Sequence, residues 1–229
     1  MRATTSHADS GQSGYRIASA ISYAVNPLVL PPICFGLVLW VAGAAPREIW
    51  LTVGVVVVFF FITPLLYLRK MVQSGEAETL EVRKQQRRTE PFIVGVASYI
   101  AGLLVLGFVL NEARGLALML GAIFPVNTLI VTAINLRWKI SVHVMSIAGF
   151  VAALGCIRFA ADHVAPASGI VVDAALLIGA CCIPLLMWAR VRAGAHTPSQ
   201  VIGGALFGFL VTALELTVLL YCFPALLAV

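Results

Sequence analysis

Long apolar runs separated by short polar stretches make up most of the chain. Seven of these runs come close to the roughly 20 apolar residues that a helix needs to cross a bilayer core. They lie at about 22–43, 49–69, 92–110, 114–136, 143–161, 168–189 and 200–224. Alternation of apolar and polar positions over roughly ten residues does not recur, which argues against a β-barrel. The pattern predicts an all-α fold, a polytopic bundle of transmembrane helices in a single domain.

The run at 92–110 is short and contains glycine, so six full spans with one partial or re-entrant helix is the alternative to seven. Residues 1–21 are polar and lack the apolar core of a cleavable signal peptide. We expect a mobile N-terminal tail over 1–21, ending in a short interfacial helix, and one transmembrane domain over 22–229. Pro27, Pro31 and Pro32 are expected to kink the first span or to delay its start.

The composition agrees with a membrane protein. Hydrophobic residues make up 61% of the chain and charged residues 11%, and the mean hydropathy is +1.00. These values exclude a soluble domain with a polar surface. The chain is therefore predicted to be a multi-pass protein of the cell (inner) membrane. All five cysteines lie in apolar runs without the spacing of metal ligands, and are expected to be free thiols.

Three polar clusters interrupt the apolar runs, at 69–91, 135–143 and 189–200. Two predicted spans separate each cluster from the next, so all three should lie at one membrane face. The N-terminus belongs to the same face and the C-terminus to the other. Twelve of the 15 Lys and Arg residues fall on the cluster face, and the positive-inside rule then makes this face cytoplasmic.

The first cluster carries a basic run that includes Arg83, Lys84, Arg87 and Arg88. A basic run beside a span is commonly an anchor for anionic lipid headgroups. On a helix, however, Arg83 or Lys84 would share a face with Arg87 or Arg88. That spacing lets two cations converge on one phosphate group, a task for which the planar guanidinium is suited.

The second cluster precedes the fifth predicted helix. Ser141 is expected to be the N-cap of that helix. The free N–H groups and the positive dipole end of a helix start favour an anion. Lys139 and His143 would face this anion.

The third cluster places Arg190 six residues before His196. Thr197 and Gln200 have the spacing of a capping box, with proline between them at the first helical position. This box would fix His196 just outside the last helix.

The polar residues at this face restrict the reactions that the protein could catalyse. They comprise two histidines, a serine and several cations. Metal binding is disfavoured because no His-x-x-x-His pair and no group of acids is present. A serine hydrolase needs a third orienting group and an oxyanion loop, neither of which can be placed. Phosphoryl transfer fits best: cations neutralise the phosphate oxygens, one histidine attacks phosphorus and a second protonates the leaving oxygen.

At the third cluster, the sequence resembles the type 2 phosphatidic acid phosphatase superfamily. The family motif Ser-Arg-x5-His-x3-Asp is matched by Arg190 and His196, with Ala189 in place of the serine and Gln200 in place of the aspartate. The resemblance covers roughly residues 83–205. The order, the spacing and the placement at one face support it together.

The other two motifs of this family are matched in part. Pro-Ser-Gly-His corresponds to Ser141 and His143, with Ile and Val at the other two positions. Lys-x6-Arg-Pro corresponds loosely to Arg83, Glu90 and Pro91, and one of the later arginines would supply the missing charge. The chain would be a diverged member of the family.

The resemblance implies His196 as the nucleophile that forms a phosphohistidine, His143 as the general acid and Gln200 in the orienting position. The phosphate would be bound by Arg190, Ser141, Lys139 and basic residues among Arg83, Lys84, Arg87 and Arg88. The expected activity is metal-independent hydrolysis of a lipid phosphate or diphosphate, of the isoprenoid or phosphatidate type. The alternatives are a phosphotransferase with an alcohol acceptor and a non-catalytic lipid-phosphate binding or transport protein.

The resemblance implies neither a metal nor another cofactor. The expected partners are the lipid phosphate substrate in the bilayer and the surrounding membrane lipids. Nothing in the sequence points to nucleic acid.

Several polar residues lie inside predicted spans. Glu215 is expected to be a hydrogen-bonded structural acid, although an intramembrane acid is often functional. Asn127, Thr128, Thr132 and Asn135 recur at roughly helical spacing. They would line a cavity or form interhelical hydrogen bonds.

Overall fold

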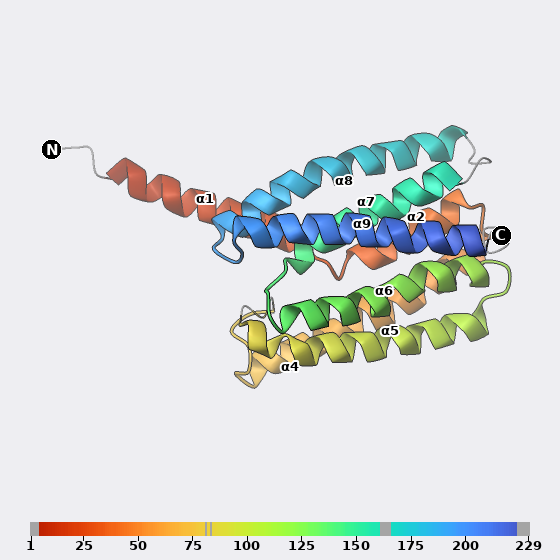
Figure 1. The fold of residues 1–229 in the computed structure, drawn as a ribbon, viewed down its shortest axis with the longest axis horizontal. Coiled ribbons are helices and arrows are strands. Elements are labelled where there is room, and N and C mark those ends of the chain that lie inside the picture. The colour runs from red at the N-terminus through yellow and green to blue at the C-terminus, as the bar shows by residue number, and fades with distance from the viewer. Residues whose placement is uncertain (1–4, 81, 83, 161–165, 224–229) are drawn as a thin grey trace.

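The structure, a computed structural model, describes residues 5–80, 82, 84–160 and 166–223. Within these ranges the regular structure is helical throughout (Figure 1). The elements are α1 (Thr5–Ala24), α2 (Leu30–Val41), α3 (Pro46–Val56), η1 (Val57–Ile62), α4 (Thr63–Gln73), η2 (Gln85–Arg87), α5 (Thr89–Val109), α6 (Arg114–Asn135), α7 (Val142–Ala160), α8 (Pro166–Arg192) and α9 (Pro198–Cys222).

Six helices in the described part of the chain are long and apolar enough to cross a membrane. The first of them joins α3, η1 and α4 into one helix, Pro46–Gln73. The other five contain α5, α6, α7, α8 and α9. The prediction of an all-α, multi-pass membrane protein is confirmed. All five cysteines are free thiols.

The partial helix is α2, not the segment at 92–110 that the sequence singled out. The span that contains α5 runs over Gln85–Val109 and is 25 residues long, whereas α2 has only 12. The apolar pattern underestimates this span because its first residues are polar. Pro91 fits there, since the first turn of a helix needs no intrahelical N–H donor.

The first predicted span, 22–43, is broken in the middle. α1 ends at Ala24 and α2 begins at Leu30. Between them, the side-chain carbonyl of Asn26 accepts the N–H of Leu28 at 2.9 Å, which supports a local turn in place of a helical bond. Pro31 stands in the first turn of α2, so the expected late start of this helix is confirmed. α1 itself is one helix of 20 residues, longer than the short interfacial helix expected at the end of the polar tail.

A wide helical turn, η1, follows from a proline in the first long helix. Pro64 has no N–H and a ring that disfavours an ordinary α-turn before it. The N–H of Thr63 bonds instead to the carbonyl of Val58, five residues back. The carbonyl of Phe59, which would face the missing N–H of Pro64, accepts the hydroxyl of Ser98 from α5 at 2.6 Å. A buried backbone acceptor is thereby satisfied by a neighbouring helix.

Two glycines bring α9 into close contact with α7. A Cβ atom on Gly204 would lie 2.6 Å from the backbone oxygen of Ser141, and one on Gly208 would lie 2.1 Å from the backbone oxygen of Met145. Only glycine permits such an approach of two backbones. The close crossing sets the start of α7 against the first turn of α9, where the N–H of Ser141 donates to the carbonyl of Gln200 at 3.2 Å.

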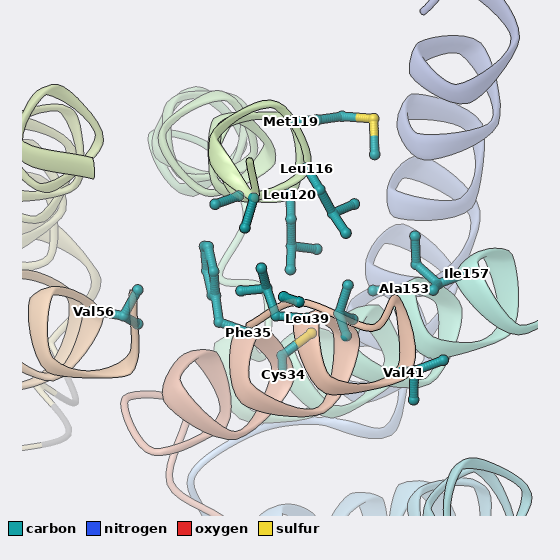
Figure 2. Close-up of a cluster of buried hydrophobic side chains, with 14 of the residues drawn as sticks. Cys34, Phe35, Leu39, Val41, Val56, Leu116, Met119, Leu120, Ala153 and Ile157 are labelled. Carbon is teal, nitrogen blue, oxygen red and sulfur yellow. The ribbon is translucent and has the colours of Figure 1, made fainter. Parts of the chain in front are cut away.

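The main hydrophobic core lies where α2 meets α6 and α7. Figure 2 shows Phe35 and Leu39 of α2 directed toward Leu116 and Leu120 of α6, with Ile157 of α7 beside them. These five side chains are buried. They fix the short helix α2 inside the bundle.

The tryptophans form a belt at each end of the bundle. Trp40 and Trp50 lie on the helices that flank the turn between α2 and α3, Trp138 lies in the loop between α6 and α7, and Trp188 lies near the end of α8. All four are exposed. Exposed tryptophans in two bands are typical of helices whose ends reach the two membrane interfaces.

All three polar clusters lie at one end of the bundle, as the span count predicts (Figure 1). The loops between α4 and α5, α6 and α7, and α8 and α9 meet there, and α1 projects from the same end. The assignment of this end to the cytoplasm stays a prediction.

Glu48 organises the opposite end. Its carboxylate is buried in α3 and accepts the N–H of Asn111 at 2.8 Å and that of Ala113 at 2.6 Å, both in the tight turn between α5 and α6. The turn has four residues, 110–113, and forms the antiparallel hairpin that its length predicts. One side chain therefore joins the first long helix to the next two.

We expect Glu48→Ala to lower the stability of the protein by roughly 2–4 kcal/mol, because the N–H groups of Asn111 and Ala113 lose a charged acceptor. Glu48→Gln keeps one carbonyl oxygen and should lose less. Thermal unfolding of both variants in detergent measures which of them loses more stability. An Ala variant as stable as the wild type would show that water replaces the carboxylate.

Candidate functional site

The capping box at the start of α9 holds His196. Thr197 is the N-cap, and its Oγ1 accepts the N–H of Gln200 at 3.4 Å. In return, Oε1 of Gln200 accepts the N–H of Thr197 at 3.2 Å and lies 3.0 Å from Nδ1 of His196. The predicted box is confirmed. Gln200 both caps the helix and orients the histidine.

A tight turn places Arg190 next to His196. Gly194 adopts a φ of +66°, a left-handed conformation that favours glycine and ends α8. The carbonyl of Arg190 then accepts the N–H of Ala195 at 3.1 Å and that of His196 at 3.3 Å. Both Arg190 and His196 are buried. The six-residue spacing seen in the sequence thus closes into one compact loop.

The hydrogen bond to Gln200 determines the tautomer of His196. Oε1 of Gln200 already accepts a backbone N–H, so it is an acceptor toward the imidazole too, and Nδ1 carries the proton. Burial lowers the pKa of His196 to about 3, and the charges of Arg88, Arg190 and Lys139 contribute, against the opposing effect of the Gln200 bond. At neutral pH the ring is uncharged, with a lone pair on Nε2.

The second cluster is tied directly to the third. Lys139 donates from Nζ to the carbonyl of Ala195 at 2.8 Å. Ser141 stands immediately before α7, where the N-cap was expected, and is completely buried. Its hydroxyl makes no capping bond: within the described part of the chain Oγ has no hydrogen-bond partner. The expected capping by the Ser141 side chain is therefore wrong. The residue is held through its backbone instead, where its N–H donates to the carbonyl of Gln200.

Arg88 joins the first cluster to the second. Its buried guanidinium donates from Nε to the carbonyl of Val82 at 2.9 Å and from Nη1 to the carbonyl of Ile140 at 3.2 Å. Val82 has a φ of +43°, a conformation that is strained for a β-branched residue. The strained residue thus presents its own carbonyl to Arg88.

Lys84 and Arg87, the other basic residues of the predicted run that the structure describes, do not reach the site. Lys84 is exposed and pairs with Glu78 at 3.1 Å, and Arg87 is exposed as well. Arg83 lies outside the described residues. The expected helical face does not form, because only a single 3-10 turn, η2, precedes α5. With Pro91 restricted to its first turn, α5 begins after the basic residues.

Two residues that the sequence did not assign to the site position this turn. Gln85 donates from Nε2 to the carbonyl of Asn135 at 2.6 Å, and Asn135 donates from Nδ2 to the carbonyl of Gln85 at 3.0 Å. Polar spacing on α6 had indicated Asn135 only as a cavity or interhelical residue. No local pattern marks Gln85. Glu90, where the family has an arginine, bonds to Tyr67 of α4.

His143 lies at the polar end of a cavity of about 240 Å³. Arg88 lies at the same end, and the rest of the wall is mostly apolar and comes from α2, α4, α5, α6, α7 and α9. Of the predicted site residues that the structure describes, only Arg88 and His143 line this cavity. Arg190, Ser141 and His196 are buried beside it. The charges of Arg88 and Arg190 act on both imidazole rings.

The arrangement offers an anion three cations, two histidines and a buried hydroxyl, next to an apolar cavity. In the described part of the chain, His, Cys, Asp and Glu side chains do not gather in a group of three or more that could hold a metal.

The fold and the site define a multi-pass α-helical membrane protein with a cationic, two-histidine cluster at one end of the bundle. No family model, no curated protein and no solved structure matches this chain. The resemblance to the phosphatase superfamily therefore stays a prediction.

The pKa of His196 predicts a loss of stability in acid. This pKa is lowered from 6.5 to about 3 in the folded state, so below pH 6.5 the unfolded chain binds a proton that the folded protein excludes. Above pH 6.5 His196 is neutral in both states and does not reduce the free energy of unfolding. Below that value the free energy of unfolding falls by at most about 1.4 kcal/mol per pH unit.

Unfolding temperatures measured in detergent between pH 7.5 and pH 4.5 test this prediction. His196→Asn keeps a donor toward Gln200 but does not titrate, and should lose less stability in acid than the wild type. Equal pH dependence in both proteins would contradict the lowered pKa.

Proposed function

We propose that the protein is a lipid phosphatase that acts through a phosphohistidine intermediate. The proposal is supported above all by one observation: three distant parts of the chain bring cations and histidines together next to an apolar cavity. Arg88 and His143 line the cavity, and Arg190, His196 and Lys139 lie beside them. Structural packing alone does not require this combination of charges, since burying several cations together is costly.

The first chemical step follows from the tautomer of His196. Nε2 attacks phosphorus, an N–P bond forms, and the bond between phosphorus and the ester oxygen breaks. The leaving alkoxide takes a proton from the imidazolium of His143 and departs as the lipid alcohol. A phosphate dianion between His143 and the two guanidinium groups favours the protonated form of His143. Arg88 and Arg190 neutralise the developing charge on the phosphoryl oxygens.

The second step returns the enzyme to its starting state. A water molecule attacks phosphorus and gives a proton to His143, now neutral. The N–P bond breaks, its electron pair returns to Nε2, and inorganic phosphate is released. The net reaction converts a phosphate ester and water into an alcohol and phosphate.

The cavity supports a lipid rather than a soluble substrate. Its wall is mostly apolar and continues from Arg88 and His143 into the membrane-spanning part of the bundle. Burial of an alkyl or prenyl chain there contributes about 0.8 kcal/mol per methylene group. Together with the predicted cytoplasmic placement of the cluster end, this favours isoprenoid phosphates or phosphatidate-type lipids in the cytoplasmic leaflet.

A second candidate function is binding of a lipid phosphate without hydrolysis. Gln200 favours it, because a neutral amide orients His196 but does not stabilise the cationic phosphohistidine as a carboxylate would. The burial of Ser141, Arg190 and His196 behind the cavity wall favours it too.

Phosphate release by the purified protein distinguishes the two functions. The substrates are prenyl phosphates, prenyl diphosphates and phosphatidate, with and without EDTA. Under the phosphatase proposal, release survives EDTA and falls at least about 100-fold in His196→Ala and in His143→Ala. Radiolabelled phosphate should be trapped on the wild type by acid-free denaturation and be absent from His196→Ala.

Gln200→Glu provides the sharper test. The carboxylate keeps the 3.0 Å geometry to Nδ1 of His196 and adds the missing charge. We expect it to raise the turnover number by about tenfold, equivalent to about 1.4 kcal/mol at the transition state. Lipid phosphates that bind without release from the wild type and from Gln200→Glu would establish the binding function.

A further inference from the structure

The cavity has a second polar site, deep among apolar residues. Asn127 of α6 and Thr212 of α9 both line the cavity and both are buried, at 8% and 4% exposure. Thr212 packs on Gly149 of α7: a Cβ atom on that glycine would lie 3.2 Å from Oγ1 of Thr212. Gly149 follows His143 by six residues on the same helix, which places this site about 9 Å deeper than the imidazole.

Glu215 fixes the orientation of the Asn127 amide. Nδ2 of Asn127 donates to Oε2 of Glu215 at 2.9 Å and approaches Oγ1 of Thr212 at 3.5 Å. Oε2 of Glu215 accepts this hydrogen bond, so the amide nitrogen faces Glu215. The amide oxygen is directed away from the carboxylate.

That oxygen is an acceptor without a donor. In the part of the chain that the structure describes, Oδ1 of Asn127 is buried and has no hydrogen-bond partner. A buried acceptor without a donor is unfavourable inside a membrane protein, where water does not replace the missing partner. The cost is removed when a ligand donates a hydrogen bond to this oxygen from the cavity.

We propose that this site binds a hydroxyl group in the chain of an amphipathic lipid. A hydroxyl donates to Oδ1 of Asn127 and accepts the hydroxyl proton of Thr212, whereas an ester or ether oxygen satisfies only Thr212. The anionic end of the same lipid lies at Arg88 and His143. The hydroxyl is then about 9 Å further along the chain, and Glu215 acts as the positioning residue.

This inference adds a chain hydroxyl to the ligand and rests on the proposed function for its anionic end. The remainder of the cavity wall contacts the apolar part of the lipid chain, so the site distinguishes lipids by one hydroxyl group. A hydrogen bond of about 1.4 kcal/mol corresponds to a tenfold preference.

Native mass spectrometry of the full chain from detergent measures this preference by competition. The probes are dodecyl phosphate and analogues that carry one hydroxyl at different carbons of the chain. We expect one position of the hydroxyl to bind about tenfold better than dodecyl phosphate, and the preference to vanish in Asn127→Leu.

Thr132→Val is the matched control. Thr132 lies on the same helix, and its hydroxyl is engaged with the carbonyl of Thr128 at 2.7 Å, so the variant removes a polar atom without touching the site. The preference should persist in this variant. A preference that survives in Asn127→Leu would show that the hydroxyl binds elsewhere, and equal binding of all analogues by the wild type would show that only water fills the site. Either result overturns the proposal.

A second set of probes separates this inference from the proposed function. Uncharged dodecane derivatives with and without a mid-chain hydroxyl do not depend on Arg88 and His143. A hydroxyl preference lost in Asn127→Leu supports the site even where no phosphate is bound or released. The absence of a preference in both sets overturns it, whatever the outcome for phosphate release.

Discussion

The structure depends on one constraint of the bilayer: a backbone N–H or carbonyl group that leaves regular helical bonding inside the membrane needs another partner. Polar side chains supply these partners at each irregularity of the chain. Ser98 donates to a backbone carbonyl in the wide turn before Pro64. Asn26 accepts a backbone N–H at the break in the first span, and Glu48 accepts one in the hairpin at the far end. Each of these three polar side chains thus supplies a hydrogen-bond partner where a helix is interrupted.

The same constraint explains how the candidate site is built. Arg88 and Lys139 each give part of their donor capacity to backbone carbonyls, at Val82, Ile140 and Ala195. These bonds hold the three loops together and hold the cations in place before any ligand arrives. Preorganised charges of this kind act on a reacting group without the cost of rearrangement. The hydrogen bonds that fix the loops therefore also fix the positions of the charges in the site.

Features set by local sequence were predictable. The helical, membrane-spanning character of the apolar runs and the capping box of Thr197 and Gln200 depend on neighbours in the chain, and both are confirmed. Features set by distant contacts were not. Arg88 reaches the site while Lys84 and Arg87 do not, because the carbonyls that select it belong to a strained loop and to Ile140. Ser141 likewise loses its capping role to a bond with α9.

The brevity of α2 has a consequence for biosynthesis. Its 12 residues extend about 18 Å, well short of a bilayer core of about 30 Å, so it does not insert stably as an independent span. Phe35 packs on Phe60 of the first long helix, which follows α2 directly, but the rest of this core belongs to α6 and α7, which leave the ribosome later. The packing of α2 is therefore complete only after these helices have entered the membrane.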